Sequence, residues 1–309
     1  MICNTILDAL GHTPIIRLNH MTKPGSAEVL VKFEGHNVGG SIKTRTAYNM
    51  ILMAEKAGRI NKDSIIVEPT SGNQGIGLSL VGAVRGYRVR IIMPDSVSEE
   101  RQKLMKHYGA EVILVHDDGD IGKCIAACLD MALQMERDDP RVFVPQQFAN
   151  SDNTMTHKNH TALEIMEQVA GPIHGFCSGI GTGGTITGIG ETLRNQFPDI
   201  QIWAVEPENA AILSGGDIGT HQQMGIGDGI IPPILNQNIY QRIYIVSDEE
   251  AINTARDLAR KEGIMCGISS GTNVAAALRL AETLGEGRTV VTVLPDTAER
   301  YFSTVLFED

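Results

Sequence analysis

Apolar and polar residues follow two alternating periods along this 309-residue chain. Short runs rich in Val and Ile are typical of strands buried in a parallel sheet, and apolar positions three or four residues apart indicate helices. Strands are predicted at residues 13–18, 28–33, 64–69, 88–93, 111–115, 174–178, 201–205 and 289–294. Helices are predicted at residues 1–12, 42–56, 76–85, 98–108, 121–137, 154–169, 186–194, 249–263 and 272–284. This order predicts an α/β fold with open, mostly parallel sheets flanked by helices.

One long segment follows neither period. Residues 211–239 are rich in Gly, Pro, Asn and Gln and are predicted to form a loop. With 42% hydrophobic residues, the chain can bury a large core, and we expect it to divide into two lobes.

Composition and charge exclude several kinds of partner. The formal net charge is −11 and no basic run occurs, so neither nucleic acid nor a membrane surface is an expected partner. The N-terminus lacks the pattern of a signal peptide, and no apolar stretch is long enough to span a bilayer. The five cysteines are odd in number and scattered, without a complete set of metal ligands. We therefore expect a cytoplasmic protein with reduced thiols and no bound metal.

Residues 39–45, Gly-Gly-Ser-Ile-Lys-Thr-Arg, are the first candidate for chemistry. Ser41 is predicted to cap the helix at 42–56, which puts Lys43 in the first turn of that helix. The positive end of the helix dipole disfavours a cation there, and this suits a lysine that must act as a neutral amine. A lysine that forms Schiff bases needs such a lowered pKa. Taken alone, the pattern is more typical of an ordinary surface lysine.

Residues 181–185, Gly-Thr-Gly-Gly-Thr, lie between a predicted strand and a predicted helix. Their glycines let backbone N–H groups approach an anion, and the helix directs its N-terminus at the same point. No Gly-Lys-Ser/Thr follows, and the spaced glycines of a dinucleotide fingerprint are missing. A phosphate monoester is therefore the best candidate ligand, although a glycine-rich turn alone is more often only a turn.

Two further loops lie where a strand meets a helix, the place where ligands bind in open α/β sheets. Residues 70–74, Thr-Ser-Gly-Asn-Gln, carry many hydrogen-bond donors suited to a carboxylate, or serve only as a helix cap. Residues 267–271, Gly-Ile-Ser-Ser-Gly, offer a serine hydroxyl between glycines. A helix-start lysine, a phosphate loop, a carboxylate loop and this serine together match pyridoxal phosphate chemistry on an amino acid.

Seven motifs in order carry a resemblance to a known family. They are Gly-Gly-Ser-Ile-Lys at 39–43, Glu-Pro-Thr-Ser-Gly-Asn at 68–73, Gln-Phe at 147–148, Gly-Thr-Gly-Gly-Thr at 181–185, Gly-Ile-Gly at 225–227, Gly-Ile-Ser-Ser-Gly at 267–271 and Glu-Arg-Tyr at 299–301. With them the chain resembles, along nearly its whole length, the cysteine synthase family of fold-type II pyridoxal phosphate enzymes, which includes O-acetylserine sulfhydrylases and cystathionine β-synthases.

The resemblance implies two lobes with the cofactor in the cleft between them. The smaller lobe would comprise residues 1–12 and 35–147, and the larger lobe residues 13–34 and 148–309. Each lobe would be an open, mostly parallel sheet flanked by helices. A homodimer is expected from the family, and a complex with a serine acetyltransferase is left open.

The resemblance also implies roles for individual residues. Lys43 carries pyridoxal 5'-phosphate as a Schiff base and later abstracts the α-proton. Asn73 contacts the ring hydroxyl, and Ser269 faces the pyridine nitrogen. The phosphate is held by Gly181, Thr182, Gly183, Gly184 and Thr185. The substrate α-carboxylate is received by Gln147 and by the loop residues Thr70, Ser71, Asn73 and Gln74.

Ser269, which the resemblance places at the pyridine nitrogen, favours one reaction type. A carboxylate partner would keep the ring nitrogen protonated and make a deep electron sink, whereas a hydroxyl does not, so departure of a β-leaving group is favoured over long-lived carbanions. Val38, Thr44 and Gln74 depart from the commoner family pattern, which has Pro, Asp and Thr at these positions. Asp228 is expected to face the incoming substrate. Gln74 and Asp228 leave the exact pair of substrates open.

The favoured hypothesis is β-replacement on O-acetylserine with sulfide, giving cysteine and acetate. The same chemistry on serine or cysteine, with a thiol or with release of hydrogen sulfide, is a close alternative. Two alternatives come from other classes. A non-catalytic binding protein of the same fold is disfavoured by the intact Lys43, and a dinucleotide-dependent oxidoreductase is disfavoured by the missing dinucleotide fingerprint.

Overall fold

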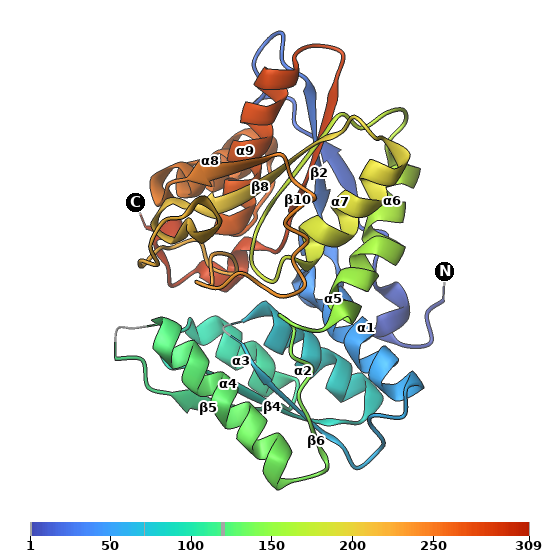
Figure 1. The fold of residues 1–309 in the computed structure, drawn as a ribbon, viewed down its shortest axis with the longest axis vertical. Coiled ribbons are helices and arrows are strands. Elements are labelled where there is room, and N and C mark those ends of the chain that lie inside the picture. The colour runs from blue at the N-terminus through green and yellow to red at the C-terminus, as the bar shows by residue number, and fades with distance from the viewer. Residues whose placement is uncertain (1, 71, 119–120, 309) are drawn as a thin grey trace.

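The computed structural model describes residues 2–70, 72–118 and 121–308. Its smaller sheet has four parallel strands in the order β5-β4-β3-β6. These strands are β3 (Ile65–Pro69), β4 (Arg88–Pro94), β5 (Glu111–Val115) and β6 (Val142–Phe143). The helices around this sheet are α1 (Lys43–Lys56), α2 (Asn73–Arg85), α3 (Glu99–His107) and α4 (Ile121–Asp138). In Figure 1 this group of elements forms the lower half of the molecule.

Alternating side chains of the small sheet face opposite layers of helices, as the pleat of a strand requires. Ile66 and Ile91 pack in one core with α1, α2 and α3. Ile65 and Ile92 point to the other side and pack against α4. Because both faces are covered, the strands carry the continuous apolar runs from which they were predicted.

The larger sheet has six strands in the order β1-β2-β10-β7-β8-β9, and only β1 runs antiparallel to its neighbour. Its strands are β1 (Ile15–Arg17), β2 (Glu28–Phe33), β7 (Gly175–Gly179), β8 (Gln201–Pro207), β9 (Arg242–Val246) and β10 (Thr289–Leu294). The helices that follow or cover it are α5 (Ser151–Thr156), α6 (Ala162–Gln168), α7 (Gly184–Gln196), α8 (Asp248–Glu262) and α9 (Ile268–Leu284).

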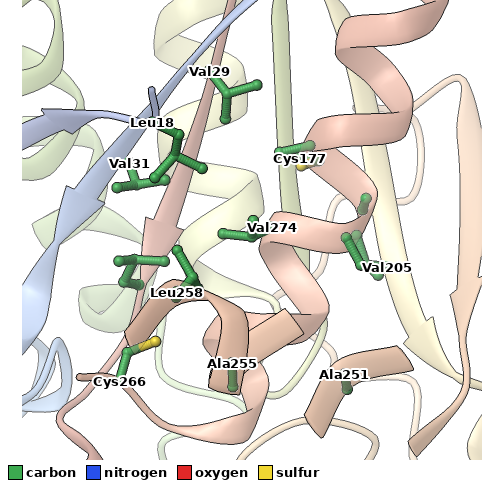
Figure 2. Packing of buried hydrophobic residues seen from close by; sticks show 14 of the residues in the cluster. Leu18, Val29, Val31, Cys177, Val205, Ala251, Ala255, Leu258, Cys266 and Val274 are labelled. Carbon is green, nitrogen blue, oxygen red and sulfur yellow. The ribbon is translucent and has the colours of Figure 1, made fainter. Parts of the chain in front are cut away.

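Helices cover both faces of this sheet as well. Val29, Val205 and Val274 belong to the core between the sheet and the pair α8 and α9, seen from close by in Figure 2. On the opposite face, Phe176 and Val291 pack against α6 and α7. The predicted α/β class, with mostly parallel sheets flanked by helices, is confirmed, whereas the residue boundaries of the two lobes stay a prediction.

Several predicted elements differ in detail. The predicted helix at 1–12 is only a 3-10 turn, Ile6–Ala9, and the predicted helix at 154–169 consists of α5, a π-helical turn, His157–Thr161, and α6. Other 3-10 turns are Glu34–His36, Val38–Gly40, Glu208–Ala210, Ile212–Ser214, Ala298–Tyr301 and Val305–Phe307. Within the described residues, no helix has both the length and the apolar character that crossing a membrane requires.

Candidate active site

The carboxyl ends of strands from both sheets meet at one cleft. The last residues of β3, β4 and β7 line it, as does Pro295 directly after β10. Most of the predicted site residues line the same cleft, namely Lys43, Thr70, Asn73, Gln74, Gln147, Gly181, Thr182, Gly183, Thr185, Asp228 and Ser269. Gly184, in the same glycine loop, is buried against Asn153, and Ser71 lies outside the described residues.

Lys43 is the first residue of α1 and lies at the junction of the two sheets. The N–H of Ile42 donates to the Pro295 carbonyl at 2.8 Å, which ties the start of α1 to the end of β10. Ser41 accepts from the Lys43 N–H at 3.3 Å, although Ile42 occupies the N-cap position. Burial lowers the pKa of the Lys43 amine, and the negative charges of Asp228 and Asp296 only partly oppose this effect. A larger share of the amine is therefore neutral than for an exposed lysine.

The glycine loop leads from β7 into α7, and Gly181, Thr182, Gly183 and Thr185 line the cleft. Gly183 has a φ of +78° and is the N-cap of α7. A Cβ at Gly181 would lie 2.5 Å from the Gly225 carbonyl oxygen, and one at Gly184 would collide with the Asn153 amide. Side chains at these positions would fill the cradle or displace its walls, so the glycines are required by close approach. A 13-residue helix starting here directs the positive end of its dipole into the cleft.

His157 supports this loop and was not predicted as a site residue. It is buried in the π-helical turn, with Nε2 3.5 Å from Thr185 Oγ1 and Nδ1 3.0 Å from Thr161 Oγ1. Burial, together with the charges of Arg45 and Lys43, holds the pKa of the imidazole well below its usual range. A neutral histidine thus orients a threonine hydroxyl of the loop. No sequence motif surrounds it, so pattern alone could not identify it.

Asn73 and Ser269 lie on the N-terminal turns of α2 and α9. The Asn73 side-chain amide donates to Asp296 Oδ2 at 2.6 Å, while Asn73 Oδ1 is buried without a partner among the described residues. Tyr301 donates its hydroxyl to the same Asp296 oxygen at 2.8 Å. Ser269 is almost wholly buried and lines the cleft. Because α9 begins at Ile268, the helix predicted at 272–284 starts earlier, and Ser269 belongs to its first turn rather than to a loop.

These groups fit a phosphorylated pyridine aldehyde. The cradle at 181–185 offers N–H and hydroxyl donors to one phosphate, and Lys43 offers an amine for an aldehyde. The orphaned oxygen of Asn73 can accept a hydrogen bond from a ring hydroxyl, and Ser269 offers a neutral hydroxyl. Each donor or acceptor that the cofactor requires is therefore present at the cleft.

Hydrogen bonds with buried neighbours fix the predicted carboxylate-binding residues in place. The side-chain oxygen of Gln74 accepts from Thr46 Oγ1 at 2.7 Å, and its Nε2 is buried without a partner among the described residues. The Gln147 N–H donates to Glu68 at 2.8 Å, so the buried Glu68 carboxyl fixes the backbone beside Gln147. Burial raises the pKa of Glu68 to about 7. Thr70 completes this neutral, donor-rich wall of the cleft.

Asp228 brings an acid to the same cleft. It lies between Gly227 and Gly229, which have φ values of +68° and +73°. His221 Nε2 lies 3.0 Å from the Gly227 carbonyl oxygen, and the preceding turn is thereby held in place. Burial raises the pKa of Asp228, and the nearby charges of Lys43 and His221 oppose that rise. A carboxyl group that is protonated at higher pH than usual can donate a proton in the cleft.

Comparison with known proteins identifies related sequences along nearly the whole chain. The family described as "Pyridoxal-phosphate dependent enzyme" matches residues 6–296. The probable cysteine synthase of Bacillus subtilis (strain 168) is 43% identical over 310 aligned positions, which cover 99% of this chain and 98% of that protein.

Solved structures show the same fold at substantial identity. A cysteine synthase (OASS) from Entamoeba histolytica has a TM-score of 0.94 and 39% identity, over 100% of this chain and 92% of that chain. A hydrogen sulfide-producing enzyme from Fusobacterium nucleatum has a TM-score of 0.91 and 39% identity, over 97% of this chain and 100% of that chain.

Proposed function

Because this chain belongs to the family of pyridoxal-phosphate dependent enzymes, with pyridoxal phosphate as its cofactor, we propose that it catalyses β-replacement on O-acetyl-L-serine with sulfide, giving L-cysteine and acetate. The similarity to cysteine synthases over almost the full length supports this reaction.

One arrangement in the cleft carries the proposal. Lys43, whose pKa is lowered by burial, shares the cleft with the phosphate cradle and with the neutral hydroxyl of Ser269. When bound, pyridoxal phosphate supplies an electron sink for charge that develops at the substrate α-carbon. A hydroxyl rather than a carboxylate at the pyridine nitrogen would make this sink shallow, which would favour loss of a β-leaving group as the α-proton is removed.

The other site residues bind, orient and move protons. Lys43 would hold the cofactor through its aldehyde and later accept the α-proton at Nζ. Residues 181–185 would hold the phosphate, and Asn73 the ring hydroxyl. Thr70, Ser71, Asn73, Gln74 and Gln147 would bind the substrate α-carboxylate. All five are neutral, so they recognise the carboxylate through hydrogen bonds alone.

A second reaction on the same site is favoured by Asp228. Cysteine loses its sulfur as hydrosulfide, which is a more basic leaving group than acetate, so proton donation to the departing sulfur assists this reaction more than it assists acetate release. A buried carboxyl with a raised pKa, lining the cleft with Lys43, is suited to donate that proton. The Fusobacterium nucleatum structure is of a hydrogen sulfide-producing enzyme, which also supports this second candidate.

The two reactions are separated by their products. The purified holoenzyme is given O-acetylserine with sulfide, or cysteine alone, and acetate and hydrogen sulfide are measured. We expect one acetate per cysteine formed in the first assay. Asp228→Asn should reduce sulfide release from cysteine more than acetate release, whereas Asp217→Asn, an exposed acid in the same segment, should change neither. If neither acetate nor sulfide is released, both candidate reactions are wrong.

The setting of the enzyme is part of the same proposal. A homodimer is expected from the family resemblance, and its mass in solution can be measured by light scattering. A cytoplasmic location is expected from the scattered cysteines and the N-terminal sequence. Whether a serine acetyltransferase binds is left open and is tested by co-elution of the two purified enzymes. Residues 1–12 and 35–147 would form the smaller of the two lobes.

A further inference from the structure

Arg101 lies in the cleft and has no role in the chemistry described so far. It comes from the first turn of α3, its side chain is 3% exposed, and it lines the cleft that holds the candidate site residues. A Cβ at Gly72 would lie 2.8 Å from Arg101 Cδ and 2.9 Å from its Nε, so the side chain packs directly on the predicted carboxylate loop. Its guanidinium carbon lies 5.0 Å from the centre of the Tyr301 ring.

This buried cation has no counter-charge in the described part of the chain. No Asp or Glu oxygen there lies within 4.0 Å of its guanidinium, and Nε is buried without a partner among the described residues. The polar contact of Nη1 is the Met224 sulfur at 3.2 Å, which is a weak acceptor. Arg45, which is equally buried, is by contrast bound by two carboxylates, Glu34 and Glu164. An unpaired buried guanidinium is strongly unfavourable, so an anionic ligand that reaches it in the cleft would be bound well.

The position of the free guanidinium points to the second substrate. If the proposed function holds, the α-carboxylate of the first substrate is bound by the neutral residues at 70–74 and Gln147. Met224, which touches Arg101, precedes the turn that carries Asp228, the residue expected to face the incoming substrate. Hydrosulfide carries no carboxylate, but many thiols do.

We propose that Arg101 binds a carboxylate carried by the attacking thiol, so that the enzyme accepts carboxylate-bearing thiols as well as sulfide. This inference rests on the proposed β-replacement. In that reaction the thiol sulfur forms a bond to the substrate β-carbon, the β-carbon–oxygen bond to acetate breaks, acetate leaves with the electron pair, and the thiol proton passes to solvent.

The direct test is the affinity of the holoenzyme for two matched thioethers, measured by isothermal titration calorimetry. S-carboxymethyl-L-cysteine and S-carbamoylmethyl-L-cysteine have nearly the same size and differ in whether the distal group is a carboxylate or a neutral amide. We expect the carboxylate to bind about 10- to 100-fold more tightly, as for a hydrogen bond to a charged group. Equal affinity in the unmodified enzyme would overturn the proposal without any variant.

Variants locate the effect at Arg101. Arg101→Met keeps an apolar stem against Gly72 and Tyr301 and should abolish the preference, while Arg101→Lys should retain part of it. Lys103→Met, an exposed change on the same helix, is the matched control and should keep the full preference. Bound cofactor measured by absorbance and near-UV circular dichroism verify that each variant is folded. A preference retained in Arg101→Met would contradict the assignment.

Free acetate, the other source of a carboxylate, is distinguished in the same titrations. If acetate at low millimolar concentration removes the preference for S-carboxymethyl-L-cysteine, the guanidinium serves the leaving group, and the assignment to the thiol is wrong. If acetate does not compete, the ratio of kcat/KM for mercaptoacetate over 2-mercaptoethanol should fall about 10- to 100-fold in Arg101→Met. The calorimetric preference is measured without turnover, so the two failures can be told apart. Failure of this inference would appear as equal binding of the two thioethers, and failure of the proposed reaction would appear as no acetate release.

Discussion

Replacing Arg45 by methionine should strongly destabilise the protein, because this residue is the centre of a buried ion cluster beside the reactive lysine. Arg45 is 2% exposed and follows Lys43 by two residues on α1. Its guanidinium binds Glu34 at 2.8 Å and Glu164 at 2.6 Å, and Lys32 binds Glu164 at 2.7 Å. These contacts link α1 to β2, to α6 and to the turn after β2. In the variant, two buried carboxylates would share a single lysine.

Two lines of reasoning give the same magnitude. Breaking a buried ion pair by removing one partner typically costs about 3–5 kcal/mol. Independently, Arg45 and Lys32 together lower the pKa of Glu164 to about 2 from 4.5, against the opposing effect of burial. At 1.36 kcal/mol per unit, this shift corresponds to about 3 kcal/mol of stabilisation from the two cations together. We therefore expect Arg45→Met to lose about 3 kcal/mol or more at pH 7.

The assay is urea unfolding at pH 7, followed by far-UV circular dichroism. Arg90→Met, which removes a largely exposed ion pair with Glu111, is the control and should cost less than about 1 kcal/mol. Acid adds a second check. Since the pKa of Glu164 is depressed in the folded state, its contribution is complete above about pH 4.5 and is lost as the pH falls towards 2. A loss below 1 kcal/mol in Arg45→Met, or the same loss in both variants, would refute the reasoning.

Two further changes test the walls of the cleft. Burial raises the pKa of Glu68 to about 7, so its contribution to folding is complete below pH 4.5 and is lost as the pH rises through 7. Glu68→Gln should remove this fall in the melting temperature between about pH 4.5 and 7, and an unchanged pH profile would contradict it. Gly184→Ala places a methyl group against the Asn153 amide, which itself binds Thr182, and should weaken cofactor binding at least about tenfold by absorbance titration. Gln196→Ala, at the exposed end of the same helix, should bind as the unmodified protein does.

The sequence predicts the regular parts of the fold well, for a physical reason. Strands such as residues 64–69 are buried on both faces, so their apolar runs are continuous and easily recognised. The glycine loop and Lys43 were identified because a ligand-binding turn must combine glycines with a helix start within a few residues. Their meeting in one cleft follows from the parallel order of strands, which brings carboxyl ends together.

The errors come from residues whose partners are distant in sequence. Gly271 looked like part of a loop, yet it lies inside α9. Glycine is required there by the close approach of α8, because a Cβ would collide with the Ala251 carbonyl. β9 was not predicted, since this strand lies at the edge of the sheet and exposes Ile245. His157 and Arg101 carry no motif, and their places in the cleft depend on packing between elements far apart along the chain.

The central claim is that Lys43 holds the cofactor covalently while its phosphate rests in the loop at 181–185. The most direct measurement is borohydride reduction of the purified holoenzyme, followed by digestion and peptide mass spectrometry. We expect the phosphopyridoxyl group on the peptide that contains Lys43 and on no other lysine. Lys43→Ala should carry none, whereas Lys56→Ala, at the exposed end of the same helix, should be labelled fully. A label on another lysine, or an active enzyme without any label, would contradict the account.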